Sequence, residues 1–410
     1  MAHPSCHNSP MKMKLKRFNK RHFLARIGRD LLARFFESFR DDFNANQLPL
    51  PPPDLPDADY INALLRLLLH PEGLPDRLNE ALFAIDDISS PQGIERLQAA
   101  PEWSGLQPML KPDSTCEDLA LQLWLVAPSV LARVHNALRL RRLTAFEHAA
   151  TRLPKDQRPP FDPTDKMAIV ALTQDLDAWF ARNQRGAETT RIEVYPMDGE
   201  FWFLIRHGDI FTRASKVEQQ NTEILHFRPE RDDVVVYSPE RDEVRVNART
   251  KGERDLYIAQ FGLRLRATVN YFCERSTYTL EPLRTGGPDS LDVREIEGLE
   301  KVVLRELEVV FDGGNREVVT RAVQGLFEFA AASNQPEVIP QDGRLARAIF
   351  DLQFAGCAKA HPVEVRLPNM LKVSRSCDTQ LVQSWLARNG FRRDSNLNPD
   401  LNPDLSPSAP

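Results

Sequence analysis

The sequence predicts a multidomain α+β protein, with an all-helical N-terminal domain followed by a β-rich, mainly antiparallel region. Residues 17–152 carry apolar side chains at spacings of three and four, the period of an amphipathic helix. Residues 191–265 hold the densest strand signals, because apolar and polar side chains alternate there. The Asp198-Gly199 pair between two apolar runs is typical of a hairpin turn, so the neighbouring strands should be antiparallel.

Residues 17–152 should form the helical domain. A helix that begins near Arg17 should bury a stripe of phenylalanines and end before the proline-rich segment 47–53, which favours an extended linker. Ser114 and Glu117 have the spacing of a capping box, in which a hydroxyl and a carboxylate bind free backbone N–H groups. Further amphipathic helices are expected at residues 59–70, 75–86, 91–99, 119–125 and 128–140.

An α+β domain is expected over residues 164–275, after a proline-rich linker at residues 153–163. Its first helix, at residues 164–181, should pack on the sheet that follows. The strands are expected at residues 191–195, 200–207, 233–237 and 243–248. A second helix should then cover residues 252–265.

Residues 276–393 should form a smaller C-terminal α+β domain. Its strands are expected at residues 276–280, 290–293, 301–311, 345–354 and 363–367, the last two of them paired. Gly313-Gly314 should end the third of these strands. Two helices are expected, one at 317–332 capped by Asn315, and one at 378–389 capped by Ser376 and ended by Gly390.

The composition is that of an ordinary globular protein. The chain has 410 residues, 42% apolar and 27% charged, and its net charge of −5 gives no overall attraction to nucleic acid or to an anionic membrane. The five cysteines are widely spaced, which argues against a disulfide framework and a zinc site. No apolar run approaches the roughly 18–20 residues of a membrane-spanning helix. We therefore expect a cytoplasmic protein without a metal ion or a membrane partner.

Both ends of the chain are expected to be disordered. Residues 1–16 form a basic leader, and Met1, Met11 and Met13 stay open as the start of translation. Residues 394–410 repeat Asn-Pro-Asp and end in serine and proline, a low-complexity composition that cannot form a packed core.

Several motifs of enzymes and cofactor-binding proteins are absent from the sequence. It contains no Walker A loop, no Gly-x-Gly-x-x-Gly fingerprint, no Gly-x-Ser-x-Gly elbow and no His-Glu-x-x-His pair. ATP hydrolysis, dinucleotide binding, α/β-hydrolase chemistry and zincin chemistry are therefore disfavoured. We expect no cofactor.

One local pattern indicates chemistry. The segment Phe203-Leu-Ile-Arg-His-Gly-Asp209 resembles the strand-end Arg-His-Gly motif of the histidine phosphatase superfamily. The resemblance implies that His207 accepts a phosphoryl group and that Arg206 holds phosphate oxygens, a role suited to a guanidinium. It also requires a second histidine and a further arginine in the same cleft.

Two groups of basic residues are candidates for nucleic-acid binding. One is the basic N-terminal run, and the other is the outward face expected for strand 243–248 together with the turn after it. Because these cations would replace the counterions of phosphates, binding should weaken steeply as the salt concentration rises. The candidates are Lys12, Lys14, Lys16, Arg17, Lys20, Arg21, Arg245, Arg249, Lys251 and Arg254.

These observations favour a non-catalytic adaptor or scaffold subunit of a cytosolic bacterial multi-protein system over an enzyme. The abundant structural signals and the lack of a complete catalytic constellation support this interpretation. The expected partner is another protein, and nucleic acid is a further partner to test. Two alternatives stay open: a phosphotransfer enzyme that uses Arg206 and His207, and a protein that binds DNA or RNA directly.

Overall fold

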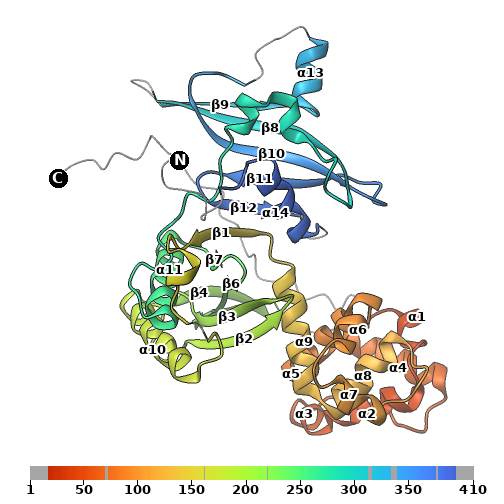
Figure 1. The fold of residues 1–410 in the computed structure, drawn as a ribbon. Coiled ribbons are helices and arrows are strands. Elements are labelled where there is room, and N and C mark those ends of the chain that lie inside the picture. Colours follow the sequence, from red (N-terminus) through yellow and green to blue (C-terminus); the bar gives the residue numbers. More distant parts are fainter. Residues whose placement is uncertain are drawn as a thin grey trace. The chain divides into compact units, whose positions relative to one another are not determined.

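The structure is a computed structural model of the chain, and it falls into two compact units, residues 1–142 and 143–410 (Figure 1). We describe each unit by itself. The residues that the structure describes are 17–69, 73–160, 162–218, 220–312, 316–333, 339–374 and 377–393. Where the chain is described, no helix is both long and apolar enough to cross a membrane.

The first unit is helical throughout its described residues, as the sequence predicts. Phenylalanines of the first three helices share one core with leucines and isoleucines of α5 and α8. The helices are α1 (Arg21–Leu24), α2 (Arg29–Glu37), α3 (Arg40–Ala45), α4 (Asp57–Leu68), α5 (Asp76–Ile88), α6 (Pro91–Gln98), α7 (Trp103–Leu106), α8 (Cys116–Val126) and α9 (Pro128–Arg141).

The long helix expected from Arg17 is instead the three short helices α1 to α3. Gly28, which precedes α2, has an extended backbone (ψ 130°) and ends the preceding helical segment. Phe39, which precedes α3, also leaves the helical region (ψ 13°). The apolar period persists through both breaks, so the phenylalanines still reach the core. The capping hydroxyl of α8 comes from Thr115, which accepts from the backbone N–H of Asp118, and not from Ser114.

The second unit is built on an antiparallel sheet of ten strands within the described residues (Figure 1). The strands follow one another in the order β2-β3-β6-β7-β1-β12-β11-β10-β8-β9. Their bounds are β1 (Ala145–Ala150), β2 (Arg191–Met197), β3 (Glu200–Gly208), β6 (Glu230–Ser238), β7 (Glu243–Asn247), β8 (Leu299–Asp312), β9 (Arg316–Ala322), β10 (Arg344–Phe354), β11 (His361–Arg366) and β12 (Met370–Val373).

Two hydrophobic cores lie along this sheet. The first is formed by α10 (Lys166–Arg182) and α11 (Lys251–Arg266) against strands β1, β3, β6 and β7. The second is formed by α14 (Thr379–Arg388) against strands β8, β10, β11 and β12. The capping box at the start of α11, made by Thr250 and Glu253, fixes that helix within a residue of the expected range.

The short pairing of β1 with β12 joins the two halves of the sheet. Ala145, Phe146 and Glu147 face Lys372, Leu371 and Met370 across this junction. Regions 164–275 and 276–393, expected as separate domains, therefore contribute strands to one sheet. The expected helical domain also ends earlier than residue 152, because residues 145–150 form a strand inside this sheet.

Three expectations in the C-terminal region are wrong. Instead of strands, residues 276–280 make only an isolated bridge from Tyr278 to Arg392, and Gly287–Leu291 is a 3₁₀ helix. The helix expected at 317–332 is strand β9 followed by the short helix α13 (Leu326–Ala332). Gly325 separates them in a left-handed conformation (φ 79°), which glycine adopts without strain.

The caps expected in this region are only partly described. Asp378 caps α14 through its side chain, and Gly390 follows the helix at a φ of 75°. Gly313, Gly314, Asn315 and Ser376 lie outside the described residues.

Candidate functional site

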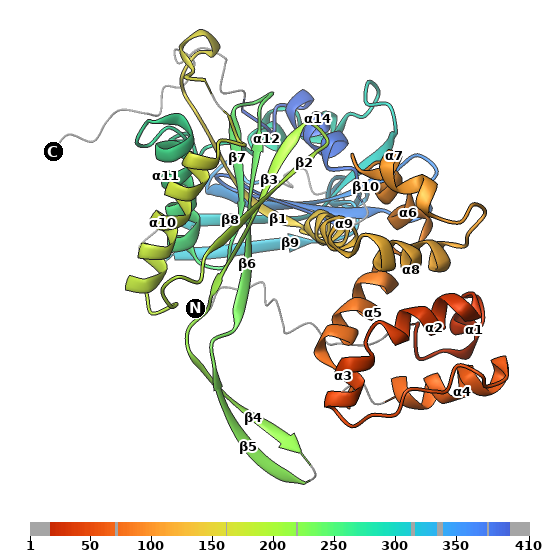
Figure 2. The ribbon, with the colours of Figure 1, turned by 90° about the horizontal axis from the view of Figure 1, so that it is seen from below.

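A hairpin that the sequence analysis did not foresee extends from the end of the sheet. It consists of β4 (Thr212–Glu218) and β5 (Asn221–Phe227), which pair only with each other among the described strands. Figure 2 shows it leaving the ends of β3 and β6 and projecting away from the rest of its unit. All seven residues of β5 are exposed. Because an isolated two-stranded hairpin is marginally stable and has two free edges, this one is suited to pairing with another chain.

The hairpin carries much of the exposed apolar surface of the described chain. Its tip carries Val217, which is 74% exposed, and the segment leading into it carries Phe211, which is 59% exposed. Of the fourteen large apolar side chains that are exposed among the described residues, six lie here: Ile210, Phe211, Val217, Ile224, Leu225 and Phe227. Solvent-exposed apolar groups concentrated in one element mark an interaction surface more often than scattered ones do.

The two faces of the hairpin differ in charge. On one face Arg213 lies opposite His226, and Ser215 lies opposite Ile224. The ring of Phe211 lies nearly parallel to that of His226, with their centroids 6.5 Å apart. On the other face, Lys216 and Glu223 lie opposite each other and form an ion pair of 3.8 Å. The first face therefore has aromatic and cationic groups without an acid among these pairs.

Four arginines gather at the base of the hairpin around Asp209, three of them near its carboxylate. The distances from Asp209 to the guanidinium nitrogens of Arg231, Arg249 and Arg185 are 3.4, 3.5 and 3.9 Å. Arg228 donates instead to the backbone carbonyls of Asp209 and Gln184, at 2.5 and 2.8 Å. We call Arg185, Arg228, Arg231 and Arg249 the arginine cluster.

Gly208 makes the close packing at this base feasible. A Cβ atom at this position would lie 2.4 Å from the carbonyl oxygen of Arg185 and 2.5 Å from the Cδ of Arg228. Such distances are well inside van der Waals contact, so a larger residue would separate the loop before β2 from the hairpin. Gly208, the last residue of the Arg-His-Gly motif, therefore has a packing role.

His207 lies in a buried network on the opposite side of the strand from Arg206. Its Nε2 lies 3.0 Å from a carboxylate oxygen of Asp233, and its Nδ1 lies 2.9 Å from the carbonyl of Gly208. Phe180 stacks on the ring at 3.9 Å. Tyr257 donates to the same oxygen of Asp233, at 2.8 Å. Both ring nitrogens thus have partners inside the protein.

These surroundings do not match those that the phosphatase resemblance implies. Successive residues of a strand point to opposite faces, so Arg206 and His207 cannot hold the same phosphate. Arg206 pairs with Glu193 at 2.5 Å on its own face. The side chain of His207 is inaccessible to solvent, and its contacts among the described residues include no second histidine.

The ligand atoms of His207, Asp233 and Glu253 lie within 4.8 Å of one another, close enough to surround a single metal ion. Their donor atoms are already engaged, however. Glu253 accepts from Arg185 through one oxygen and from the backbone N–H of Thr250, at 2.6 Å, through the other. The guanidinium of Arg185 supplies the positive charge that a metal ion would bring. The network therefore fits a structural ion pair better than a metal centre.

We expect added Mn²⁺ or Zn²⁺ to leave the thermal unfolding midpoint of the protein unchanged relative to a sample in a chelating buffer. An ion bound only by the folded state, at about 100 times its dissociation constant, would add about 2.7 kcal/mol. A rise in the midpoint that the Glu253→Gln variant abolishes would contradict this prediction.

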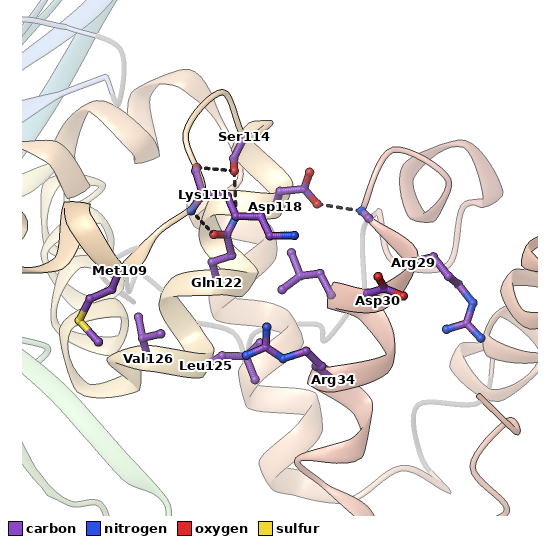
Figure 3. A pocket seen from close by; sticks show the side chains of 12 residues that line it. Arg29, Asp30, Arg34, Met109, Lys111, Ser114, Asp118, Gln122, Leu125 and Val126 are labelled. Atoms are coloured by element: carbon purple, nitrogen blue, oxygen red, sulfur yellow. Dashed lines mark hydrogen bonds between the residues drawn. The ribbon is translucent and has the colours of Figure 1, made fainter. Parts of the chain in front are cut away.

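The helical unit contains a separate cavity of about 310 Å³, near the lower limit for small-molecule sites. Figure 3 shows its polar rim, where Lys111, Ser114 and Gln122 bond to one another and Asp118 accepts from the backbone N–H of Gly28. Arg34 and Met109 also line it, and no histidine or cysteine does. Lys111, Ser114, Gln122 and Asp118 are thus engaged in hydrogen bonds within the unit.

The predicted nucleic-acid candidates have different environments, and the expectation that Arg245 faces outward is wrong. Arg245 is buried beside the rings of Phe146 and Trp202 and pairs with Glu200, because side chains of neighbouring strands cover this face of the sheet. Arg254 pairs with Glu147 at 2.6 Å. Of the candidates in the second unit, only Arg249 belongs to the arginine cluster.

The remaining candidates divide between exposed, paired and undescribed residues. Lys20, Arg21 and Lys251 are exposed. Arg17 pairs with Asp86 at 2.7 Å. Lys12, Lys14 and Lys16 lie outside the described residues.

Sequence reasoning missed Arg185, Arg228, Arg231, Arg213 and Phe211. The sequence signal for them was weak. Basic residues flank residues 209–231, where apolar and polar side chains alternate, but this stretch is so polar that no strand was assigned to it. A scan against models of protein families gives no match, and no curated protein matches the chain.

Proposed function

We propose that this protein is a non-catalytic adaptor that binds a partner protein through its β4–β5 hairpin. The observation that carries the proposal is the concentration of exposed apolar side chains on a hairpin with two free edges. A strand of the partner would extend the hairpin by main-chain hydrogen bonds, and its side chains would cover Val217, Ile224 and Leu225. The buried, fully bonded state of His207 adds support, since it removes the strongest candidate for a catalytic residue.

The finer setting belongs to the same proposal. We place the adaptor in the cytosol of a bacterial cell, as a subunit of a multi-protein system. Cys116, Cys273, Cys357 and Cys377 are free thiols, two of them exposed, which suits a reducing compartment.

Site-specific photo-crosslinking in the native host tests this proposal. A photoreactive amino acid at Val217 or Ile224 should yield a covalent product with one other protein. The same amino acid at Val269, which is 67% exposed and lies outside the hairpin, serves as the matched control and should not yield that product. Replacing residues 216–223 by an Asn-Gly turn, which suits a two-residue hairpin, should remove the partner from the purified protein.

Two outcomes would contradict the adaptor proposal. One is the same set of products from Val217, Ile224 and Val269, because the hairpin would then have no special role. The other is a product formed only between two copies of this chain, which would make the hairpin a self-association element.

A further inference from the structure

The arginine cluster carries more positive charge than its neighbours neutralise. Its four guanidinium groups face two carboxylates, those of Asp209 and Glu253. Glu253 is engaged with Arg185 and the cap of α11, which leaves Asp209 to balance the other three arginines. The base of the hairpin is therefore locally cationic, although the chain as a whole has a net charge of −5.

The contacts in the cluster leave donors for a ligand. The distance from the carboxylate of Asp209 is 3.4 Å to Arg231 and 3.5 Å to Arg249. Both are longer than the roughly 2.7–3.2 Å of an ordinary N–H···O bond. A guanidinium has five N–H donors, so most of those on these two side chains have no acceptor among the described residues. The side chain of Arg249 is 45% exposed, so a ligand can reach it from solvent. Asp209 thus holds two arginines near each other and leaves most of their N–H donors available.

An exposed aromatic ring lies next to another arginine of the cluster. The guanidinium carbon of Arg228 is 5.9 Å from the centre of the Phe211 ring. Arg213, exposed on the same face as His226, continues the cationic surface along the hairpin. Cationic groups that contact phosphates, combined with a ring on which a base can stack, are the elements by which proteins bind single-stranded nucleic acid.

We propose that the arginine cluster and Phe211 form a binding site for single-stranded nucleic acid. Arg231 and Arg249 bind the phosphate backbone, and a base stacks on Phe211. This goes beyond the adaptor function, because the hairpin tip binds the partner protein and the hairpin base binds the nucleic acid. An acidic polypeptide would satisfy the same arginines, but it has no base to stack on the exposed ring of Phe211.

The test is fluorescence anisotropy with a labelled oligothymidylate of about 20 nucleotides, titrated with the full chain at salt concentrations from about 50 to about 200 mM. The double variant Arg231→Gln/Arg249→Gln should weaken binding at least tenfold and reduce the salt slope by about 1.4, for two lost phosphate contacts. The single variant Arg249→Gln changes an exposed side chain, so it tests the site even where the double variant loses stability. The matched control, Arg294→Gln/Arg388→Gln, changes two exposed arginines elsewhere in the unit and should bind normally.

Phe211→Ala should weaken binding about tenfold with little change in the salt slope, because a stacking contact releases no counterions. Three results would overturn the proposal: no binding by the unmodified chain at about 50 mM salt, equal binding by Arg249→Gln and the control, or competition by polyglutamate as strong as by unlabelled oligothymidylate. The last would identify an acidic polypeptide as the ligand. The adaptor proposal is judged separately, since crosslinking from Val217 should be unaffected by the arginine variants.

Discussion

Asp242→Asn should lower the free energy of unfolding by about 3–5 kcal/mol, because it leaves the buried Arg266 and the partly buried Arg158 without this counter-ion. Asp242 is buried and pairs with Arg266, and its other oxygen lies 3.4 Å from Arg158. Tyr237 and Tyr271 also donate to it, at 3.0 and 2.5 Å. Asparagine keeps the size of the side chain and tolerates the left-handed backbone at this position (φ 51°). Its amide replaces one acceptor oxygen by an NH2 donor, so the variant loses the charge together with one set of these hydrogen bonds.

Urea unfolding of the variant and the unmodified chain measures this effect. Asp198→Asn is the matched control, since Asp198 has a similar backbone conformation (φ 53°) but lies exposed in the β2–β3 turn. The control should change the free energy of unfolding by less than about 0.5 kcal/mol. Equal effects of the two substitutions would show that the buried charge of Asp242 does not hold this end of the sheet together.

Stability should fall as the pH drops below about 6.5, and His148 should cause part of that fall. His148 lies inside the sheet, with its Nδ1 2.8 Å from Glu243 and its Nε2 3.2 Å from the hydroxyl of Tyr278. Burial lowers the pKa of His148 to about 4, in spite of the attraction of Glu243. Between this value and about 6.5 the unfolded chain binds a proton that the folded chain excludes, so acid favours unfolding.

A second loss should follow at lower pH. Burial would raise the pKa of Glu243, but the positive charges of His148 and Arg392 and the hydrogen bond from His148 lower it to about 2. The stabilisation that this carboxylate contributes is therefore complete above its unfolded pKa and is lost as the pH falls toward 2.

Urea unfolding at a series of pH values tests the role of His148. His148→Asn keeps a donor toward Glu243 but cannot titrate, so it should reduce the loss between about pH 6.5 and 4 by about 3 kcal/mol. His22→Asn, which changes an exposed histidine of α1, should leave the pH dependence as it is. A variant whose pH dependence matches that of the unmodified chain would rule out His148 as the group responsible.

Local signals in the sequence predicted the elements that they determine. The Asp198-Gly199 pair predicted the turn that joins β2 and β3 as a hairpin. The capping box of Thr250 and Glu253 is a local signal of the same kind at the start of α11, although the prediction of this helix did not use it. The division into a helical part and a β-rich part is also confirmed. Each of these depends on residues close together in the chain.

The failures arise where distant segments decide the outcome. Arg245 points to the opposite face of β7 from Val244 and Val246, as its alternation predicts, but side chains from β1 and β3 cover that face. Residues 316–322 have helical spacing, yet Val318 and Val319 pair with residues of β8 in the sheet. The arginine cluster draws on the loop before β2, the connection from β5 into β6 and the segment after β7, which the sequence alone cannot bring together.

The position of β1 also affects how the protein is made. This strand lies between β7 and β12, yet Met370 follows Asn247 by 123 residues. At a synthesis rate of about 5–20 residues per second, β1 can pair with β7 and then wait about 6–25 seconds on the ribosome for its second neighbour. During that interval one edge of β1 is open to strands of other nascent chains. Synthesis therefore exposes a pairing edge that the finished molecule encloses.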